Sequence, residues 1–396
     1  MRNGSEMEHA ATGTAPDDEP DRADAEPLAG IRVLEFGHYI AAPAATQVLR
    51  DLGADVVKVE PPAGDQARSI GAYGEGIVLA YNRGKRSVAL DLRTDEGRRR
   101  ALALVRGADV VVQNLRAGAM ERLDLGVARL QEERPDLVHV SVTGFPQASP
   151  SAGRAGLDIA AQAESGIMGI TGTADGEPQR VGFPIADVGA SQAVVQAVLA
   201  GLFRRERTGQ GFVAEVSLLE AAVQMQAAMW GEWHVSGAEP HRKGNGQATV
   251  APAADVVTTR DGQVVLSAYT VEHFARLCDF LGKPGLVTDP RFVDNPSRVA
   301  HRRALLVEVE EVLGRLTTQE CVDQLGELGL VVAAVRTYAD VAASPDVGAS
   351  GLMVHATGPG GDELTVPGLP FRMTGLAPPT DQRVPAAGEH TDEEPW

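Results

Sequence analysis

The sequence predicts an α/β fold, with a doubly wound parallel sheet in its first half and a small α+β lobe after it. Two observations predict this fold. Strand-like and helix-like segments alternate between residues 31 and 143, an order that right-handed crossovers turn into a parallel sheet. Beyond residue 230 the composition changes, and a Gly-rich polar stretch at 238–250 indicates a crossing between two domains.

The elements of the first half follow from their apolar runs and helix signals. The run 31–36 is typical of a buried strand, and Pro43 suits the first turn of a helix that ends near Gly53. Thr94 is placed to cap a helix that reaches about residue 106, after a long loop containing NRGKRSVALD. Further strands are expected at 55–60, 109–113 and 137–143, and a further helix at about 127–132.

Helical patterns dominate the rest of the chain. Three of them lie at 157–168, 188–207 and 218–230. The second of these helices opens on Asp187 and ends at Gly209. The lobe that follows is expected to hold short strands at 255–258 and 263–267 and helices at 271–281, 297–313 and 317–328.

Composition argues against several classes of protein. The 396-residue chain has a net charge of −18, which disfavours nucleic acid as a partner. No uninterrupted apolar run reaches the roughly 18 residues that span a membrane, and the acidic start lacks the apolar core of a signal peptide, so we expect no membrane partner and a cytoplasmic location. Residues 1–27 carry eight acidic side chains and few large apolar ones, which predicts a disordered tail. Cys278 and Cys321 have no metal or redox spacing and are expected to be core thiols.

The loop after the first strand is a candidate ligand site, because open α/β sheets bind ligands at the carboxyl ends of their strands. Its sequence, GHYIAAP, lacks the glycines of a G-x-G-x-x-G turn, which argues against a nicotinamide or flavin cofactor. His38 stands at the strand end. Two interpretations remain open for it: a ligand contact, or a histidine hydrogen-bonded to the backbone.

Basic residues follow the second strand and the strand at 109–113. Along the carboxyl edge of one sheet they would suit a phosphorylated ligand, although for each one by itself a solvated surface charge is the stronger interpretation. They are Arg83, Lys85, Arg86, Arg93, Arg116 and Arg122.

Asp187 precedes the helix at 188–207 and has two interpretations. The simpler is a helix N-cap, a position that aspartate fills well. The second adds chemistry, because backbone N–H groups and the helix dipole favour an ionised carboxylate, the form that attacks a carbonyl. Small neighbours such as Gly182 and Gly189 would leave room for a thioester. On the residues alone, the capping interpretation is the stronger.

Several strings, in consistent order from about residue 28 to residue 394, resemble the class III CoA-transferases, the family of formyl-CoA transferase, carnitine CoA-transferase and the α-methylacyl-CoA racemases. They are LAGIRVLEFGHYIAAPAATQVLRDLGADVVKVEPPAGD, NRGKRSVALDLRTDEG, ADVVVQNLRAGAMERLDLG, GLDIAAQAESGIMGITG, IADVGAS, RRERTGQG, SLLE and GEHTDEE. One such string would be a weak signal, whereas the ordered set is a specific one.

The resemblance implies a Rossmann-like large domain, a small domain and two linkers, in a ring-like chain that interlocks with a second copy as a homodimer. The implied division is the tail at 1–27, the large CoA-binding domain at 28–225, the small domain with linkers at 226–330, and a segment at 331–396 that returns to the large domain. Coenzyme A thioesters are then substrates, with no permanently bound cofactor and no metal.

The resemblance also implies site residues. Asp187 matches the catalytic aspartate of the family. The residues expected to bind coenzyme A are His38, Ile40, Ala41, Leu90, Arg93, Asn114, Leu115, Arg116, Arg122 and Asp158.

The expected activity is transfer of coenzyme A from an acyl-CoA donor to a carboxylic acid through an aspartyl anhydride and an aspartyl-CoA thioester. Formyl-CoA transferase has glutamine at Ile40 and tyrosine at Leu157, so a small doubly charged acceptor such as oxalate is not expected. A fairly apolar acyl pocket is suggested by Ile40, Leu157, Phe145 and the 225–233 stretch.

Three alternatives stay open. The racemases have a histidine in a G-H-D-I string, and here Gly156-Leu157-Asp158-Ile159 lacks that base. Transfer between two carboxylates of one diacid would also need one aspartate. A homologue that binds coenzyme A without catalysis is the third alternative.

Overall fold

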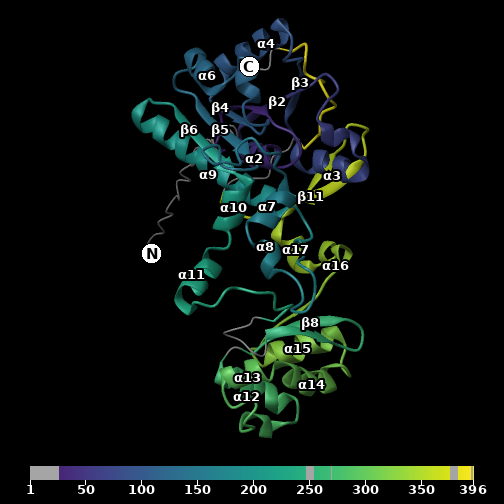
Figure 1. The fold of residues 1–396 in the computed structure, drawn as a ribbon. Helices are drawn as coiled ribbons and strands as arrows, with labels where there is room; N and C mark the ends of the chain where they lie inside the picture. The colour runs from purple at the N-terminus through teal and green to yellow at the C-terminus, as the bar shows by residue number, and fades with distance from the viewer. Residues whose placement is uncertain (1–25, 247–253, 269, 375–381, 394–395) are drawn as a thin grey trace, which may run out of the picture.

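A computed structural model describes residues 26–246, 254–268, 270–374, 382–393 and 396 (Figure 1). The expected disordered tail lies outside these residues, apart from Glu26 and Pro27, as does part of the expected crossing at 238–250.

The large domain is built on a six-stranded parallel sheet, as the alternating pattern predicted. Four of its strands lie where the sequence placed them, within a residue. They are β1 (Arg32–Phe36), β2 (Asp55–Glu60), β4 (Val110–Gln113) and β5 (Val138–Thr143). The strand order is β3-β2-β1-β4-β5-β6, so the winding direction reverses between β1 and β4. A crevice for ligand is expected at this switch point.

The remaining two strands of this sheet and the helix α3 were missed. β3 (Arg86–Ala89) and α3 (Gly71–Tyr81) lie in the stretch predicted to be a long loop, and β6 (Phe212–Ser217) was not expected. Both strands are sheet edges. β3 is short and carries charge, and its outer side is covered by the C-terminal segment, where the backbone N–H of His390 donates to the Ser87 carbonyl at 2.8 Å. Charged side chains and cover of this kind are how edge strands avoid pairing with other chains.

Helices cover both faces of the sheet. Alternate residues of β1 separate the two cores, since Val33 faces one apolar cluster and Leu34 the other. The first cluster packs under α2 (Ala41–Asp51), α7 (Asp158–Glu164), α9 (Ile185–Thr208) and α10 (Leu218–Gln224). The second packs under α4 (Asp95–Gly107), α5 (Ala119–Arg122) and α6 (Val127–Glu133). Thr94 caps α4 as predicted, accepting a hydrogen bond from the Gly97 backbone at 3.0 Å.

α9 is the longest helix, and it qualifies the expectation about membrane segments. Polar residues interrupt its apolar run, yet it is long and apolar enough to cross a membrane when hydropathy is averaged over 18 residues. In this fold its buried residues, such as Val194 and Val198, pack in the core beneath β5 and β6. A core helix of a parallel sheet passes the same test.

The small domain contains the antiparallel strands β7 (Ala254–Thr258) and β8 (Gln263–Ser267), as predicted. A third strand, β9 (Val331–Ala334), pairs with β8, so this sheet extends beyond residue 330. The helices α12 (Val271–Phe280), α13 (Asn295–Ala300), α14 (Arg302–Leu313) and α15 (Thr318–Glu327) enclose a separate core. Cys278 and Cys321 are buried in this core as free thiols.

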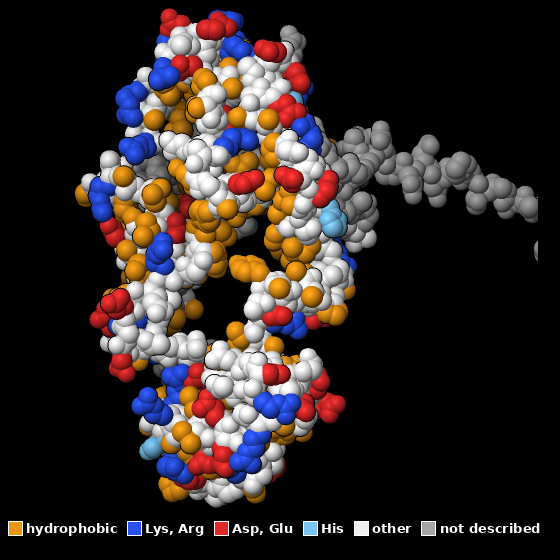
Figure 2. Space-filling model, turned by 90° about the vertical axis from the view of Figure 1, so that its right-hand side faces the viewer, with side chains coloured by type: hydrophobic (Ala, Val, Ile, Leu, Met, Phe, Trp, Pro, Cys, Tyr) orange, Lys and Arg blue, Asp and Glu red, His pale blue; other side chains and the backbone are white. Residues whose placement is uncertain are grey.

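Two connections join the domains. One runs from α10 through α11 (Ala227–Ser236), and the other returns through α16 (Tyr338–Ala342), α17 (Pro345–Ser350) and the hairpin β10 (Met353–Thr357) and β11 (Glu363–Pro367) (Figure 1). Figure 2 shows an opening between the upper and lower parts of the molecule, with hydrophobic side chains along its rim. The chain therefore follows the ring-like path that the resemblance implied.

Candidate functional site

The topology brings the sequence-predicted residues to one edge of the sheet. His38, Ile40 and Ala41 follow β1, Asn114, Leu115 and Arg116 follow β4, and Leu90 and Arg93 follow β3. α9 precedes the parallel strand β6, so its first turn also lies at the carboxyl ends of the strands. The candidate nucleophile and the candidate ligand loops therefore share one edge.

Asn114 joins the loops on the two sides of the switch point. Its Oδ1 accepts from the His38 backbone N–H and its Nδ2 donates to the His38 carbonyl, both at 2.9 Å. The side-chain amide of Asn114 therefore fixes the β1 loop, and its contact with any nucleotide would be a second role.

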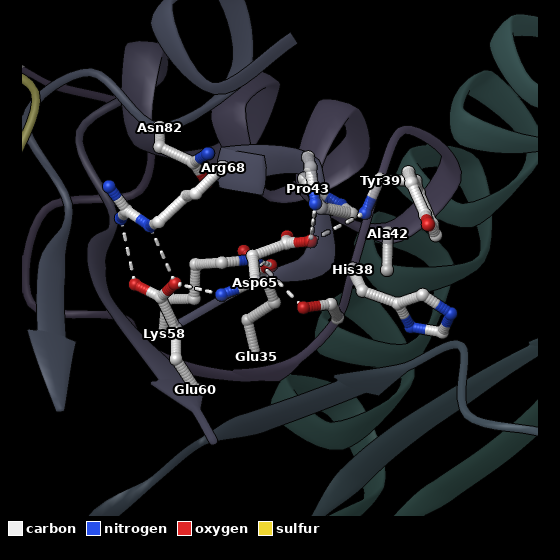
Figure 3. Close-up of polar contacts among 12 residues, drawn as sticks. Glu35, His38, Tyr39, Ala42, Pro43, Lys58, Glu60, Asp65, Arg68 and Asn82 are labelled. Atoms are coloured by element: carbon white, nitrogen blue, oxygen red, sulfur yellow. Dashed lines mark hydrogen bonds and ion pairs between the residues drawn. The ribbon is translucent and has the colours of Figure 1, made fainter. Parts of the chain in front are cut away.

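The His38 side chain is partly buried beside Tyr39, whose ring centroid lies 5.3 Å from its own (Figure 3). Burial lowers the pKa of His38, so the imidazole is neutral near pH 7. Its Nδ1 is buried and has no hydrogen-bond partner in the described part of the chain. A buried nitrogen without a partner is uncommon in proteins, and it marks a position where a bound water or a ligand group would complete the hydrogen bonding.

Three of the expected ligand contacts have buried side chains. Ile40 and Leu90 are each 4% exposed and Ala41 is 2% exposed, and they pack in the cores beneath the sheet edge. Their side chains are not at the surface, so contact with a ligand would fall to their backbone groups. Leu115 is half-buried.

The six basic residues divide into buried, paired and free groups. Arg83 and Lys85 are buried against Asp51 and Glu35, which excludes them from contact with solvent phosphates. Arg86 pairs with Asp55, and the exposed Arg93 pairs with Asp91 at 2.8 Å. The exposed side chains of Arg116 and Arg122 form no ion pair with any described residue, which leaves these two for an anionic ligand.

Asp187 is not the N-cap that the sequence predicted. α9 begins at Ile185 with Pro184 as N-cap, so Asp187 is its third residue. The expected effect on ionisation was also wrong in direction. Burial, followed by the charge of Asp158, raises the pKa of Asp187 to about 7. The Asp187 carboxylate forms no hydrogen bond or ion pair with the described residues, so nothing offsets the cost of its burial.

Asp158 has both carboxylate oxygens engaged within the protein. Oδ1 accepts from the Ala186 backbone N–H at 2.8 Å, and Oδ2 accepts from Gln162 Nε2 at 2.6 Å. Gln162 Oε1 in turn accepts from the Val181 N–H at 3.0 Å. The structure therefore gives Asp158, which was expected to bind coenzyme A, a contact with the first turn of α9.

Tyr81, at the end of α3, was missed because its helix was assigned to a loop. Burial raises the pKa of Tyr81, and Tyr73 and Asp187 raise it further, so its hydroxyl lies within electrostatic range of the candidate nucleophile. An aromatic residue at the end of a helical apolar run, just before NRGKRS, was the signal that could have found it.

The apolar surroundings differ in part from expectation. A Cβ at Gly189 would lie 2.7 Å from the Met225 thioether, so in this structure Met225 fills the space beside this glycine, whereas a Cβ at Gly182 would meet no atom within 4 Å. Phe145 is 1% exposed and, like Ile40, cannot line an open pocket. Leu157 and Phe183, which neighbour Asp158 and Asp187 in the chain, are 63% and 50% exposed. Among the described residues, no group of three potential ligands could hold a metal ion.

Comparison with known proteins identifies relatives over nearly the whole chain. The model of CoA-transferase family III matches residues 28–391. A succinyl-CoA:mesaconate CoA-transferase of Haloarcula hispanica is 36% identical, over 92% of this chain and 95% of its own. A probable fatty acyl-CoA transferase of Mycobacterium tuberculosis is 36% identical, over 94% and 98%. The crystal structure of a CAIB/BAIF family protein from Brucella suis matches with a TM-score of 0.84 and 34% identity, over 92% and 97%.

Proposed function

The chain belongs to CoA-transferase family III, and from this premise we propose that it moves coenzyme A from an acyl-CoA donor to a carboxylic acid, with Asp187 as the nucleophile. The observation that supports Asp187 is its isolation. A carboxylate that is partly buried and lacks a cationic or hydrogen-bonding partner among the described residues is costly, and such groups occur mainly where chemistry needs them.

In the proposed cycle the Asp187 carboxylate is first the nucleophile, and its acyl carbon is then the site of attack. One oxygen attacks the thioester carbonyl of the donor, the C–S bond breaks, and a mixed anhydride and CoA thiolate form. The thiolate then attacks the aspartyl carbonyl, which releases the donor acid and leaves an aspartyl-CoA thioester.

The acceptor carboxylate attacks this thioester in the same way, forming a second anhydride and releasing the thiolate. The thiolate finally attacks the acceptor carbonyl, which yields the new acyl-CoA and regenerates Asp187. No proton is consumed, so the carboxylate must be ionised at the start, and a pKa of about 7 places half of the free enzyme in that form near neutral pH.

The β1 loop and the free arginines are proposed to hold coenzyme A. The unpaired Nδ1 of His38 and the first turn of α2 both belong to the segment that follows β1, at the switch point of the sheet. Arg116 and Arg122 follow β4 and carry the charges that phosphate groups require. This division assigns the pantetheine side to the β1 loop and the phosphates to the β4 loop.

The acyl group is proposed to be aliphatic. Among the described residues, Asp158 is the one charged side chain that shifts the pKa of Asp187, and its charge is negative. A second carboxylate on the substrate would therefore be repelled from this site. The exposed side chains of Leu157, Phe183 and Met225 offer apolar contacts instead. The relatives are named for both mesaconate and fatty acyl substrates, and these charges favour the second class.

A homodimer is proposed as the working form. None of the residues of α11 is buried in the chain, and three of them are large and apolar. Trp230, Trp233 and Val235 are 47%, 42% and 88% exposed. Trp230, Trp233 and His234 line a hollow of about 410 Å³. Exposed apolar surface of this kind on a connection beside an open ring (Figure 2) favours contact with a second copy.

The test is to trap the acyl-enzyme. Protein incubated with octanoyl-CoA and then treated with hydroxylamine should carry a hydroxamate on Asp187, located by peptide mass spectrometry. The Asp187→Asn variant should bind the donor and carry no label, whereas Glu164→Gln, a surface carboxylate of α7, serves as a matched control that labels normally. Labelling that survives in Asp187→Asn would overturn the nucleophile assignment. Deuterium exchange at the α-carbon of a branched acyl-CoA, without transfer, would instead favour a racemase.

A further inference from the structure

The loop between β1 and α2 is held at both ends by buried lysines. Lys58, on β2, donates from Nζ to the carbonyl of Gly37 at 2.7 Å, and Lys85, just before β3, donates to the carbonyl of Pro43 at 2.9 Å. Both lysine side chains are at most 1% exposed. The two ammonium groups therefore clamp the start and the end of loop 37–43.

Glu35 connects the two lysines. Its Oε1 lies 2.6 Å from Lys58 Nζ and its Oε2 lies 2.8 Å from Lys85 Nζ, and Thr46 donates to it at 2.5 Å. Burial alone would raise the pKa of Glu35, but the two lysines lower it to about 2. Together with Asp65, 3.1 Å from Lys58, the cluster contains two positive and two negative charges, of which Figure 3 labels Glu35, Lys58 and Asp65.

The middle of the loop is held by the same cluster and its neighbours. Asp65 Oδ1 accepts from the Tyr39 N–H at 3.3 Å, and Asn114 binds both backbone groups of His38. Tyr39 has a φ of 58°, a conformation that costs a non-glycine residue free energy unless its surroundings impose it. The polar contacts thus impose a backbone shape that the residues of the loop would not adopt alone.

A buried ion cluster is a poor source of stability compared with apolar side chains of the same volume, because its charges lose their hydration. What it supplies is fixed geometry, and the loop it fixes carries His38, Ile40 and Ala41. We propose that Glu35, Lys58 and Lys85 are positioning residues, which hold loop 37–43 in the shape that receives coenzyme A. This proposal rests on the proposed function for the identity of the ligand.

The test compares two variants in which an ion pair is removed without leaving an unbalanced charge. Glu35→Gln with Lys85→Met removes the anchor at Pro43 and leaves Lys58 paired with Asp65. The control, Asp109→Asn with Arg205→Met, removes an ion pair of 3.1 Å between the start of β4 and the end of α9, at the amino edge of the same sheet. Circular dichroism and the thermal midpoint confirm that each variant is folded.

Two readouts are needed. Calorimetric titration with coenzyme A should give a Kd raised about tenfold in the loop variant, a loss equivalent to about 1.4 kcal/mol, and unchanged in the control. Amide hydrogen exchange of the peptide spanning residues 37–43 should be faster in the loop variant alone. If both variants lower the thermal midpoint but neither changes Kd, the cluster is merely structural and the proposal is overturned.

The two readouts also separate this proposal from the proposed function. Failure of the unaltered protein to bind coenzyme A would contradict the function, while the exchange of loop 37–43 would still report whether the cluster holds it. Faster exchange without weaker coenzyme A binding would overturn the positioning role and leave the function intact. Unchanged exchange in the loop variant would overturn the proposal directly.

Discussion

Asp158 accepts a hydrogen bond from the backbone N–H of Ala186 at 2.8 Å, one residue before Asp187. The first N–H groups of a helix lack partners within the helix, and α9 has no side-chain cap of its own. The Asp158 carboxylate, from α7, therefore gives a first-turn N–H group of α9 the hydrogen-bond partner that an N-cap side chain usually supplies. The same carboxylate places a negative charge beside the candidate nucleophile.

Replacing Asp158 with asparagine should shift the pH dependence of catalysis to lower pH. Asparagine keeps an oxygen that can accept from Ala186 but removes the charge that, after burial, raises the pKa of Asp187. The rate of acyl-enzyme formation should rise with pH around a midpoint near 7 in the unaltered protein and below 7 in the variant. Stopped-flow measurements between pH 5 and pH 9 would show this, and an unmoved midpoint would contradict the influence of Asp158.

Gln162→Leu is the matched control for that experiment. It removes the hydrogen bond to Asp158 Oδ2 and the contact with the Val181 backbone, while the charge of Asp158 stays. The rate should fall because the turn before α9 is held less firmly, but the midpoint should not move to lower pH. A common shift in both variants would mean that geometry, not charge, sets the ionisation of Asp187.

Asp187→Asn should abolish transfer and stabilise the fold. A carboxyl group whose pKa is raised from 3.8 to about 7 binds a proton in the native state that the unfolded chain releases, so stability falls as pH rises between those values. Above pH 7 the variant should be more stable by up to about 4 kcal/mol, and less than this if solvent screens the partly exposed carboxylate. Urea unfolding at pH 8 and at pH 4 checks the sign, because the difference should shrink at the lower pH. A less stable variant at pH 8 would contradict it.

His139 on β5 should make the protein sensitive to acid. Its side chain is 2% exposed with no partner for Nδ1 among the described residues, and burial lowers its pKa from 6.5 to about 4. The unfolded chain therefore binds a proton that the native state excludes, and stability is lost as pH falls from about 6.5 to about 4. The contribution is about 3 kcal/mol. His139→Leu should flatten the unfolding free energy over this range, and His355→Gln, at an exposed site on β10, should leave it unchanged.

Placing a charge on α11 should weaken self-association. Trp233 is 42% exposed on a helix with no buried residue, so Trp233→Glu should fold normally and disfavour burial against a second copy. Light scattering after size exclusion should give twice the chain mass for the unaltered protein and the chain mass for the variant. Val307→Glu, at a 62% exposed site on α14 of the small domain, is the control. If the unaltered protein has the mass of a single chain, the dimer proposal is wrong.

Elements with strong local signals were predictable from the sequence. The strands β1, β2, β4 and β5 are rich in Val and Leu and are buried along almost their whole length, as central parallel strands are, and Thr94 showed where α4 begins. The edge strands lack that signal, because they are buried on fewer sides. β6 alternates between exposed and partly buried residues, and β3 lies inside a basic stretch that resembles a loop.

By itself the sequence determined the α/β class, the family, and the choice of Asp187 and of the loops after β1 and β4, since each depends on local pattern or on ordered strings. Only the tertiary structure decided which of these residues are free to act. In the sequence Lys85 and Arg83 resemble phosphate contacts, but in the structure both form buried ion pairs within the protein. Asp158 accepts a hydrogen bond from the first turn of α9. The ionisation of Asp187 was decided in the same way. Burial and a neighbouring charge come from segments far away in the chain, and they outweigh the helix terminus that the local sequence reveals.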